Sequence, residues 1–145
     1  MKEISFSIPG APQGKARART FYNSSMGRMQ SITPERTVLY ENLIKLMYQH
    51  EAHGEQMDEG PLMAVIAAYY EPPKSASKKQ LDAMLNGKSF PMKKPDLDNI
   101  IKVVLDALNG VAYHDDKSII GVAATKAYDM EPRVDVRLEV MDING

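Results

Sequence analysis

The sequence predicts an α+β fold, a single small domain in which helices pack on a mixed β-sheet. The chain has 145 residues, 43% of them hydrophobic, which suits one globular domain with a sizeable core. Segments that alternate apolar and polar residues indicate half-buried strands, and apolar residues at helical spacing lie between them. The sequence has no internal repeat or low-complexity segment, so residues 1–145 are taken as one domain.

The first elements expected are a strand, an arm and a long helix. Ile4, Phe6 and Ile8 alternate with polar residues before Pro9-Gly10, as in a short strand. Residues 11–32 are rich in turn formers and should form an arm or loose hairpin outside the core. Thr33-Pro34 predicts an N-cap with proline at the first helical position of a helix over about 34–53. Its apolar residues at helical spacing are Val38, Leu39, Leu43, Leu46 and Met47.

The rest of the chain should alternate strands and helices. We expect a buried strand at 62–70, a short capped helix at 77–86, a loop at 88–94, a helix at 97–109, and strands at 118–128 and 134–140. The helix at 97–109 is predicted because Leu97, Ile100, Ile101, Val104 and Leu108 share one face. In the last strand Asp135, Arg137 and Glu139 alternate with apolar residues, so its outer face should be wet.

Composition limits the kind of site. The absence of cysteine excludes disulfides and thiolate metal sites, and the three scattered histidines, His50, His53 and His114, argue against a zinc cage. Any metal would therefore be bound by oxygen. No apolar run approaches the ~18 residues that a membrane span requires, and the first residues lack the apolar stretch of a secretory signal. We therefore expect a cytoplasmic protein without membrane contact.

The net charge of -1 conceals two basic segments. Residues 1–36 hold Lys2, Lys15, Arg17, Arg19, Arg28 and Arg36 against only Glu3 and Glu35. Residues 74–94 hold Lys74, Lys78, Lys79, Lys88, Lys93 and Lys94 against only Asp82. Such a distribution can steer a polyanion to one face, although solvated surface lysines give the same pattern.

The most informative motif is Pro95-Asp96-Leu97-Asp98-Asn99. Pro95 disfavours helical geometry at the residue before it, so the chain should enter the helix at about Asp96, with Asp96 as N-cap and Asp98 in the first turn. Both carboxylates then lie at the positive end of the helix dipole. Lys102 and Asp106 continue the polar stripe at i+4 and i+8 from Asp98, so Lys102 can reach what Asp98 binds.

These residues can hold magnesium. Magnesium prefers oxygen ligands and usually takes one or two carboxylates with water and substrate phosphate, so Asp96, Asp98 and one of Asp115 or Asp116 would suffice. The metal could activate a water and stabilise the leaving oxygen, while Lys102 neutralises the phosphate or orients the water. Taken alone, the spacing favours a structural role, with a cap at Asp96 and an Asp98–Lys102 ion pair worth roughly a few tenths of a kcal/mol.

Nearly the whole chain resembles the RusA family of Holliday junction resolvases, which are small and often phage-borne endonucleases. The resemblance is carried by residues 94–102, 105–113 and 115–116, and by residues 8–19 and 33–37 near the start. It implies Mg²⁺, with Mn²⁺ able to substitute, held by Asp96, Asp98 and Asp116, and Lys102 as the catalytic lysine. Asp115 would cap or support the site from outside the ligand shell, as would Asn99.

The resemblance also implies a mixed α+β fold, a two-fold homodimer and a role in DNA recombination and repair. A four-way junction is nearly two-fold symmetric, so a dimer supplies one active site to each of two matching nicks. Phosphates would be held, without sequence reading or a small-molecule cofactor, by Lys15, Arg17, Arg19, Lys78, Lys79, Lys93 and Lys94. Phe21 and Tyr22 could wedge into the crossover, although packing is the commoner role for such residues.

The sequence departs from the family pattern at two places. The arm has alanine at Ala16 and Ala18, where the pattern Gly-Arg-Pro-Arg is expected, and the segment 74–94 is longer than in the smallest members.

Two other functions are compatible with the sequence. A junction-binding protein without cleavage, or a metal-dependent nuclease of flaps or linear ends, would carry the same basic segments. The substitution Asp98→Asn separates the first of these from a resolvase, because a nuclease would lose cutting and keep binding.

Overall fold

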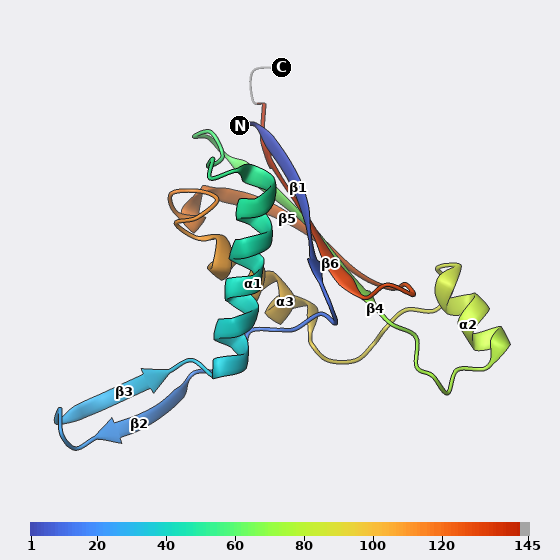
Figure 1. Cartoon of the computed structure of the whole chain (residues 1–145), viewed down its shortest axis with the longest axis horizontal. Coiled ribbons are helices and arrows are strands. Elements are labelled where there is room, and N and C mark those ends of the chain that lie inside the picture. The colour runs from blue at the N-terminus through green and yellow to red at the C-terminus, as the bar shows by residue number, and fades with distance from the viewer. Residues whose placement is uncertain (143–145) are drawn as a thin grey trace.

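The structure is a computed structural model that describes residues 1–142. Its centre is a four-stranded mixed sheet with two long helices on one face (Figure 1). The elements are β1 (Glu3–Pro9), β2 (Arg19–Asn23), β3 (Arg28–Ile32), α1 (Glu35–Ala52), β4 (Leu62–Tyr70), α2 (Lys78–Leu85), α3 (Leu97–Leu108), the 3-10 turn η1 (Asp116–Ser118), β5 (Ile119–Tyr128) and β6 (Arg133–Val140). The predicted α+β class and the predicted strands and helices are confirmed, with boundaries shifted by one or two residues.

The sheet has the order β1-β6-β4-β5. β6 pairs antiparallel with both β1 and β4, whereas β4 and β5 are parallel. Parallel neighbours need a crossover connection. Here the crossover contains α2, α3 and η1, so the acidic motif at the start of α3 lies within the β4–β5 connection.

The core lies between one face of this sheet and helices α1 and α3. The inward residues of β4 alternate strictly with half-buried ones, from Leu62 to Tyr70, and β6 buries Val134, Val136 and Leu138. The predicted wet face of β6 is therefore confirmed. α3 buries Ile100, Val103, Val104, Ala107 and Leu108, which confirms the apolar face predicted for it. No helix in residues 1–142 is long and apolar enough to cross a membrane.

The helix predicted at 34–53 forms as α1, but the apolar residues whose spacing predicted it are not those that it buries. The helix buries Thr37, Tyr40, Ile44, Tyr48 and Ala52, while Val38, Leu39 and Leu46 are exposed and Leu43 and Met47 only half-buried. The sequence offers two apolar stripes on this helix, and the aromatic one packs. Tyr48 meets Phe6 of β1 edge-on at 5.6 Å between ring centroids and donates a hydrogen bond to the Glu55 carbonyl at 2.6 Å. Pro34 is the N-cap instead of the predicted Thr33, so the helix begins one residue later than predicted.

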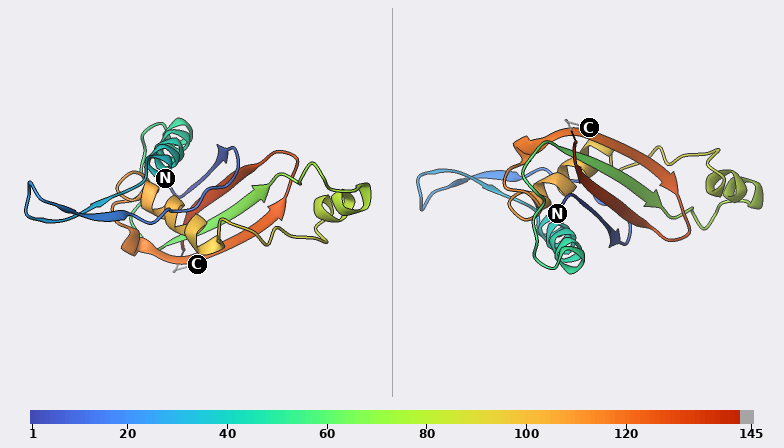
Figure 2. Two further views of the ribbon diagram at one scale, coloured as in Figure 1. Left: turned by 90° about the horizontal axis from the view of Figure 1, so that it is seen from below. Right: turned by 90° about the horizontal axis from the view of Figure 1, so that it is seen from above.

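Two appendages project from opposite ends of the molecule (Figures 1 and 2). The arm predicted at 11–32 contains the antiparallel hairpin β2–β3, in which Phe21 is opposite Gln30 and Tyr22 is opposite Met29. At the other end α2 begins with a capping box between Ser77 and Gln80 and buries none of its residues. Neither appendage belongs to the core, so both are available for a binding partner.

Candidate active site

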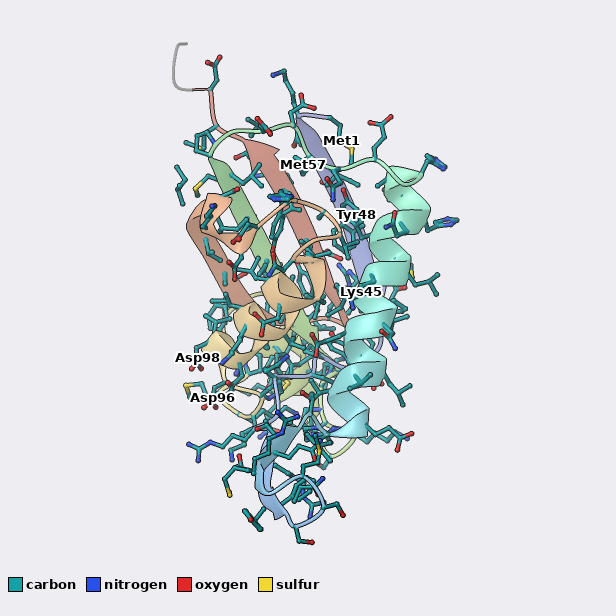
Figure 3. All side chains as sticks on the ribbon, turned by 90° about the vertical axis from the view of Figure 1, so that its left-hand side faces the viewer. Met1, Lys45, Tyr48, Met57, Asp96 and Asp98 are labelled. Carbon is teal, nitrogen blue, oxygen red and sulfur yellow. The ribbon has the colours of Figure 1, made fainter. Side chains whose placement is uncertain are left out.

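The first turn of α3 presents two exposed carboxylates. Asp96 occupies the N-cap position with extended backbone angles, and Asp98 lies in the first turn. Asp96 accepts no capping hydrogen bond, contrary to the capping role that its position suggests. Figure 3 shows both side chains at the surface, at the end of α3 nearest the hairpin. Within residues 1–142 neither carboxylate has a hydrogen-bond donor or an ion-pair partner, so their oxygens face solvent and can take a cation.

Tyr70 and Lys126 hold the segment that leads into this turn. The Tyr70 hydroxyl donates to the Pro95 carbonyl at 3.0 Å. The Lys126 ammonium donates to the carbonyls of Lys93 at 2.5 Å and Pro95 at 3.1 Å, and it lies 5.1 Å from the centroid of the Tyr70 ring. Burial, together with the nearby Asp96 carboxylate, raises the pKa of Tyr70 to about 12, so its hydroxyl remains a donor at neutral pH. Side chains from two strands, β4 and β5, therefore hold the backbone before Asp96 in place.

The root of the arm packs against the same turn. A Cβ on Gly14 would lie 2.9 Å from the Asn99 Cβ and 3.0 Å from the Pro95 Cβ, closer than side-chain carbons normally approach. The Lys15 amide donates to the Asn99 carbonyl at 3.0 Å. The Ala16 amide donates to the Thr37 hydroxyl on α1 at 3.3 Å. Glycine at position 14 thus lets the arm leave the body directly beside Asp96 and Asp98.

Lys15 joins the two long helices. Its ammonium lies 3.0 Å from the Glu41 carboxylate of α1 and 3.4 Å from the Asp106 carboxylate of α3. Burial alone would lower the pKa of Lys15, but the two carboxylates outweigh it and raise the pKa. The Lys15 side chain is only 21% exposed. This ammonium is engaged within the chain, whereas a phosphate contact was predicted for it.

Two hollows flank Asp96, and cations line both. One, of about 430 Å³, is bounded by the arm root and α3 and includes Arg36 and Lys94. The other, of about 490 Å³, lies on the far side of the turn and includes Lys93, Lys94 and Lys126. Asp96 lines both hollows. Cations therefore lie on each side of the Asp96 carboxylate.

Asp115 and Asp116 lie near the other end of α3. Asp115 caps η1 by accepting from the Lys117 amide at 3.0 Å, and the Asp116 amide donates to the Asn109 side chain at 3.1 Å. The hydrogen bond to the Lys117 amide, followed by one from Asp116, lowers the pKa of Asp115. The same contact with Asp115, with the negative charges of Asp115 and Asp106, raises the pKa of Asp116. Contact between the two carboxyl groups therefore moves their pKa values apart, with Asp115 the stronger acid.

The structure gathers some of the predicted residues and separates others. Asp96, Asp98, Asn99 and Lys102 share the first turns of α3, with Asn99 lining a hollow and Lys102 exposed. Asp116 interacts with Asp106, which lies eight residues beyond Asp98, or about 12 Å along the helix axis. Within residues 1–142 no three acidic or histidine side chains come together as a metal cage. The pair at Asp96 and Asp98 still fits Mg²⁺, which needs only one or two carboxylates beside water and phosphate.

The predicted DNA-contacting cations other than Lys15 are exposed. Arg17 and Arg19 are on the hairpin arm, Lys78 and Lys79 on α2, and Lys93 and Lys94 beside Asp96. Phe21 and Tyr22 are 39% and 62% exposed on the hairpin, which leaves them free for the predicted wedge.

Sequence reasoning missed Lys126, Tyr70, Arg36 and Gly14. A signal for Lys126 exists, because it is opposite Ala68 in the register and so lies on the helix-covered face of the sheet, where lysine is unusual. Arg36 and Gly14 belong to segments that the sequence analysis had singled out, but their place beside Asp96 depends on contacts with distant parts of the chain.

For the Mg²⁺-dependent cleavage that the resemblance implies, we expect the substitutions Tyr70→Phe and Lys126→Met to slow cutting by about 10–100-fold and to raise the Mg²⁺ concentration needed for half-maximal rate, because the turn carrying Asp96 loses its supports. Tyr69→Phe is the matched control, since the neighbouring hydroxyl has no such bond. Rates over a Mg²⁺ titration, with junction affinity measured in parallel, check this. Equal rates for the Tyr70 and Tyr69 variants would contradict the positioning role.

The acidic pair predicts a pH response in the metal-free protein. The pKa of Asp116 is raised in the folded chain. Its contribution to stability is therefore fully present below pH 3.8, the ordinary pKa of aspartate, and is lost as the pH rises through the pKa of the folded state. The pKa of Asp115 is lowered in the folded chain. Its contribution to stability is therefore present above pH 3.8 and is lost as the pH falls through the pKa of the folded state. NMR titration of the carboxyl carbons should show Asp116 titrating above Asp115, and Asp115→Asn should lower the pKa of Asp116. The reverse order would contradict the geometry.

Comparison with known proteins adds two findings. The family model described as endodeoxyribonuclease RusA matches residues 9–139, which include the arm, α3 and the acidic pair. The chain is also 32% identical over 138 residues to the uncharacterized protein YqaN of Bacillus subtilis strain 168, covering 93% of this chain and 94% of that protein.

Proposed function

Because the chain belongs to the RusA family of endodeoxyribonucleases, we propose that it is a magnesium-dependent nuclease that resolves four-way DNA junctions by paired nicks, in recombination and repair. The observation that carries this proposal is the pair of exposed carboxylates, Asp96 and Asp98, which have no partner within residues 1–142 and of which Asp96 lines two cation-lined hollows. A purely structural motif would have used these carboxylates as a cap or in ion pairs, and the described contacts show neither.

Each residue of the turn has a proposed task. Asp96 and Asp98 would hold Mg²⁺, or Mn²⁺ in its place, and Asp116 is the third proposed ligand, although within one chain it lies at the far end of α3. The bound ion would supply an activated water and charge stabilisation at the leaving oxygen. Lys102, one turn beyond Asp98, would neutralise the scissile phosphate or orient the water. Tyr70 and Lys126 keep the turn in place through the Pro95 carbonyl.

The DNA would be held by cations at and around this turn. Lys93 and Lys94 line a hollow together with Asp96. The hairpin and α2, which project at opposite ends of the molecule (Figure 2), carry further exposed cations. Contacts of this kind bind phosphates and make affinity fall steeply with salt, without reading base sequence. Shape would then select the branched substrate.

Paired nicking requires two active sites, and so we propose a two-fold homodimer. A four-way junction is nearly two-fold symmetric, so one copy would serve each of two matching strands. A single copy has one acidic turn with Asp96 and Asp98. It would therefore cut one strand each time it binds.

A binding protein without cleavage is the main alternative, favoured by the two basic appendages. It leaves the solvent-facing carboxylates and Lys102 unexplained. A nuclease of flaps or linear ends uses the same chemistry and differs only in substrate.

The test compares a four-way junction, a flap and a linear duplex of equal length, each with wild-type protein and Mg²⁺ at equal concentration. We expect rapid cleavage of the junction and slow cleavage of the others. Binding of the junction with no product would overturn the nuclease proposal. Equal or faster cleavage of the flap or the linear duplex would assign the other substrate class.

A further inference from the structure

The hairpin formed by β2 and β3 has two different faces. In an antiparallel pair, residues directly opposite each other share a face, and successive residues of one strand alternate between faces. One face, here called the basic face, consists of Arg19, Phe21, Asn23, Arg28, Gln30 and Ile32. The other, here called the neutral face, consists of Thr20, Tyr22, Met29 and Ser31. Hydrogen bonds agree with this division, since the Asn23 side-chain amide donates to the Gln30 side-chain oxygen at 2.8 Å.

All the charge of the hairpin lies on the basic face. Arg19 and Arg28 are the only charged residues between positions 19 and 32, and both are exposed. Within residues 1–142 neither guanidinium has a hydrogen-bond or ion-pair partner, and no hydrogen bond joins β2 or β3 to the body of the protein. Two free cations on one side of a projecting ribbon (Figure 1) can bind phosphates there.

The neutral face carries an exposed apolar pair. Tyr22 and Met29 are directly opposite each other and are 62% and 60% exposed, and neither belongs to the core. DNA-binding proteins use aromatic and apolar side chains of this kind to stack on bases or to enter between base pairs. A face without charge has no attraction for phosphates, so an uncovered base pair is the DNA surface that fits it.

We propose that the hairpin enters the branch point of a DNA junction and contacts it with both faces. The basic face holds phosphates of one arm, while Tyr22 and Met29 stack on the base pair that ends a neighbouring arm. This inference rests on the proposed function and names the feature of the branched substrate that is recognised. In a linear duplex each base pair is covered by the next, so entry of a side chain requires unstacking. An open branch point leaves the last pair of each arm uncovered, and the neutral face therefore favours branched DNA.

The hairpin is attached close to the acidic turn. At the root of the arm, the Lys15 amide donates to the Asn99 carbonyl of α3 at 3.0 Å. Figure 3 shows Asp96 and Asp98 at the end of α3 nearest the hairpin. A base pair held by the neutral face would therefore fix the branch point relative to the two carboxylates, so that the cuts fall near the crossover.

Phe21 is the competing side chain, because an aromatic ring could also stack from the basic face. It is 39% exposed, less than Tyr22, and it shares its face with Arg19 and Arg28. A face whose arginines hold phosphates lies against the outside of the DNA, where base pairs are not uncovered. The register therefore assigns stacking to the neutral face and places Phe21 on the side of the DNA backbone.

Affinities for a four-way junction and for a linear duplex of equal length test the proposal. All variants carry Asp98→Asn, so that binding is measured without cleavage. The double substitution Tyr22→Ala and Met29→Ala should lower the ratio of junction affinity to duplex affinity by about 10–100-fold, because base stacking is lost. The affinity for the duplex should stay unchanged, because the basic face is intact.

Two comparison variants give different expected results. Arg19→Gln with Arg28→Gln should weaken binding of junction and duplex alike and reduce the slope of log affinity against log salt by about two. Leu39→Ala with Leu46→Ala removes exposed apolar side chains from α1 and should change neither affinity.

A conservative variant separates stacking from folding of the hairpin. Tyr22→Phe with Met29→Leu keeps an aromatic ring and an apolar neighbour, so it should retain the wild-type ratio. The proposal is overturned if the double alanine variant keeps that ratio, if it weakens duplex binding equally, or if Phe21→Ala lowers the ratio as much.

Photo-crosslinking locates the contact. 5-Iodouracil replaces a thymine either in the base pair at the branch point or in the middle of an arm, and the complex with the Asp98→Asn protein is irradiated. We expect a crosslink to Tyr22 from the branch point alone. A crosslink to Phe21, or none from the branch point, would refute the inference. Cleavage by wild type is measured separately, so a junction that is contacted by Tyr22 yet left uncut would overturn the nuclease proposal and not this one.

Discussion

Replacing Asp98 with asparagine should lower the rate of junction cleavage by about a thousand-fold while leaving junction binding within a few-fold of wild type. Within residues 1–142 the carboxylate has no protein partner, so its loss removes a proposed metal ligand and little else. Metal-assisted charge stabilisation is worth several kcal/mol, and each 1.36 kcal/mol is a tenfold change in rate. Single-turnover cleavage and gel-shift affinity on the same junction measure the two effects separately.

The control for this experiment is Asp82→Asn, an exposed aspartate on α2 away from the acidic turn. It should cut at the wild-type rate. If Asp98→Asn also cut within a few-fold of wild type, the first turn of α3 would not be the cutting centre, whatever the family resemblance implies.

Replacing Lys15 with methionine should destabilise the fold by about 2 kcal/mol, because Glu41 and Asp106 would lose the ammonium between them while remaining partly buried. Arg17→Met, two residues along the arm, should leave the free energy of unfolding unchanged and weaken junction binding, since Arg17 is exposed and predicted to contact phosphate. Urea unfolding and salt-dependent junction affinity distinguish the two substitutions.

The two outcomes separate two roles for neighbouring basic residues. If Lys15→Met left stability unchanged and weakened binding as Arg17→Met does, the ammonium would serve DNA and the bridge between α1 and α3 would contribute nothing. If Arg17→Met alone changed the salt dependence, the arm would bind DNA through its exposed cations and be fastened to the body by Lys15.

Much of the fold could be predicted because local patterns agreed with tertiary packing. The strand at Leu62–Tyr70 and the helix at Leu97–Leu108 each have one unambiguous apolar pattern, and both formed as expected. The face of α1 could not be read in the same way. Its leucines and its tyrosines form two competing stripes, and only the position of β1 decides in favour of the tyrosines.

Only those parts of the candidate site that are close together in the sequence could be predicted. Asp96, Asp98 and Lys102 lie on one helix, so their proximity follows from helical spacing. Two features depend on contacts between distant segments and have no local signature: the bridge made by Lys15 and the separation of Asp116 from Asp98. Spacing along a helix also fixes nothing about the loop beyond it, which is why the three acidic residues could be expected together and are found at two ends of α3.

The most direct test of the central claim is to map the cuts in a four-way junction whose four strands are labelled one at a time. With Mg²⁺ we expect single nicks at matching positions in two opposite strands, and none when the metal is removed with EDTA. A junction that is bound yet intact, or strands degraded progressively from their ends, would contradict it.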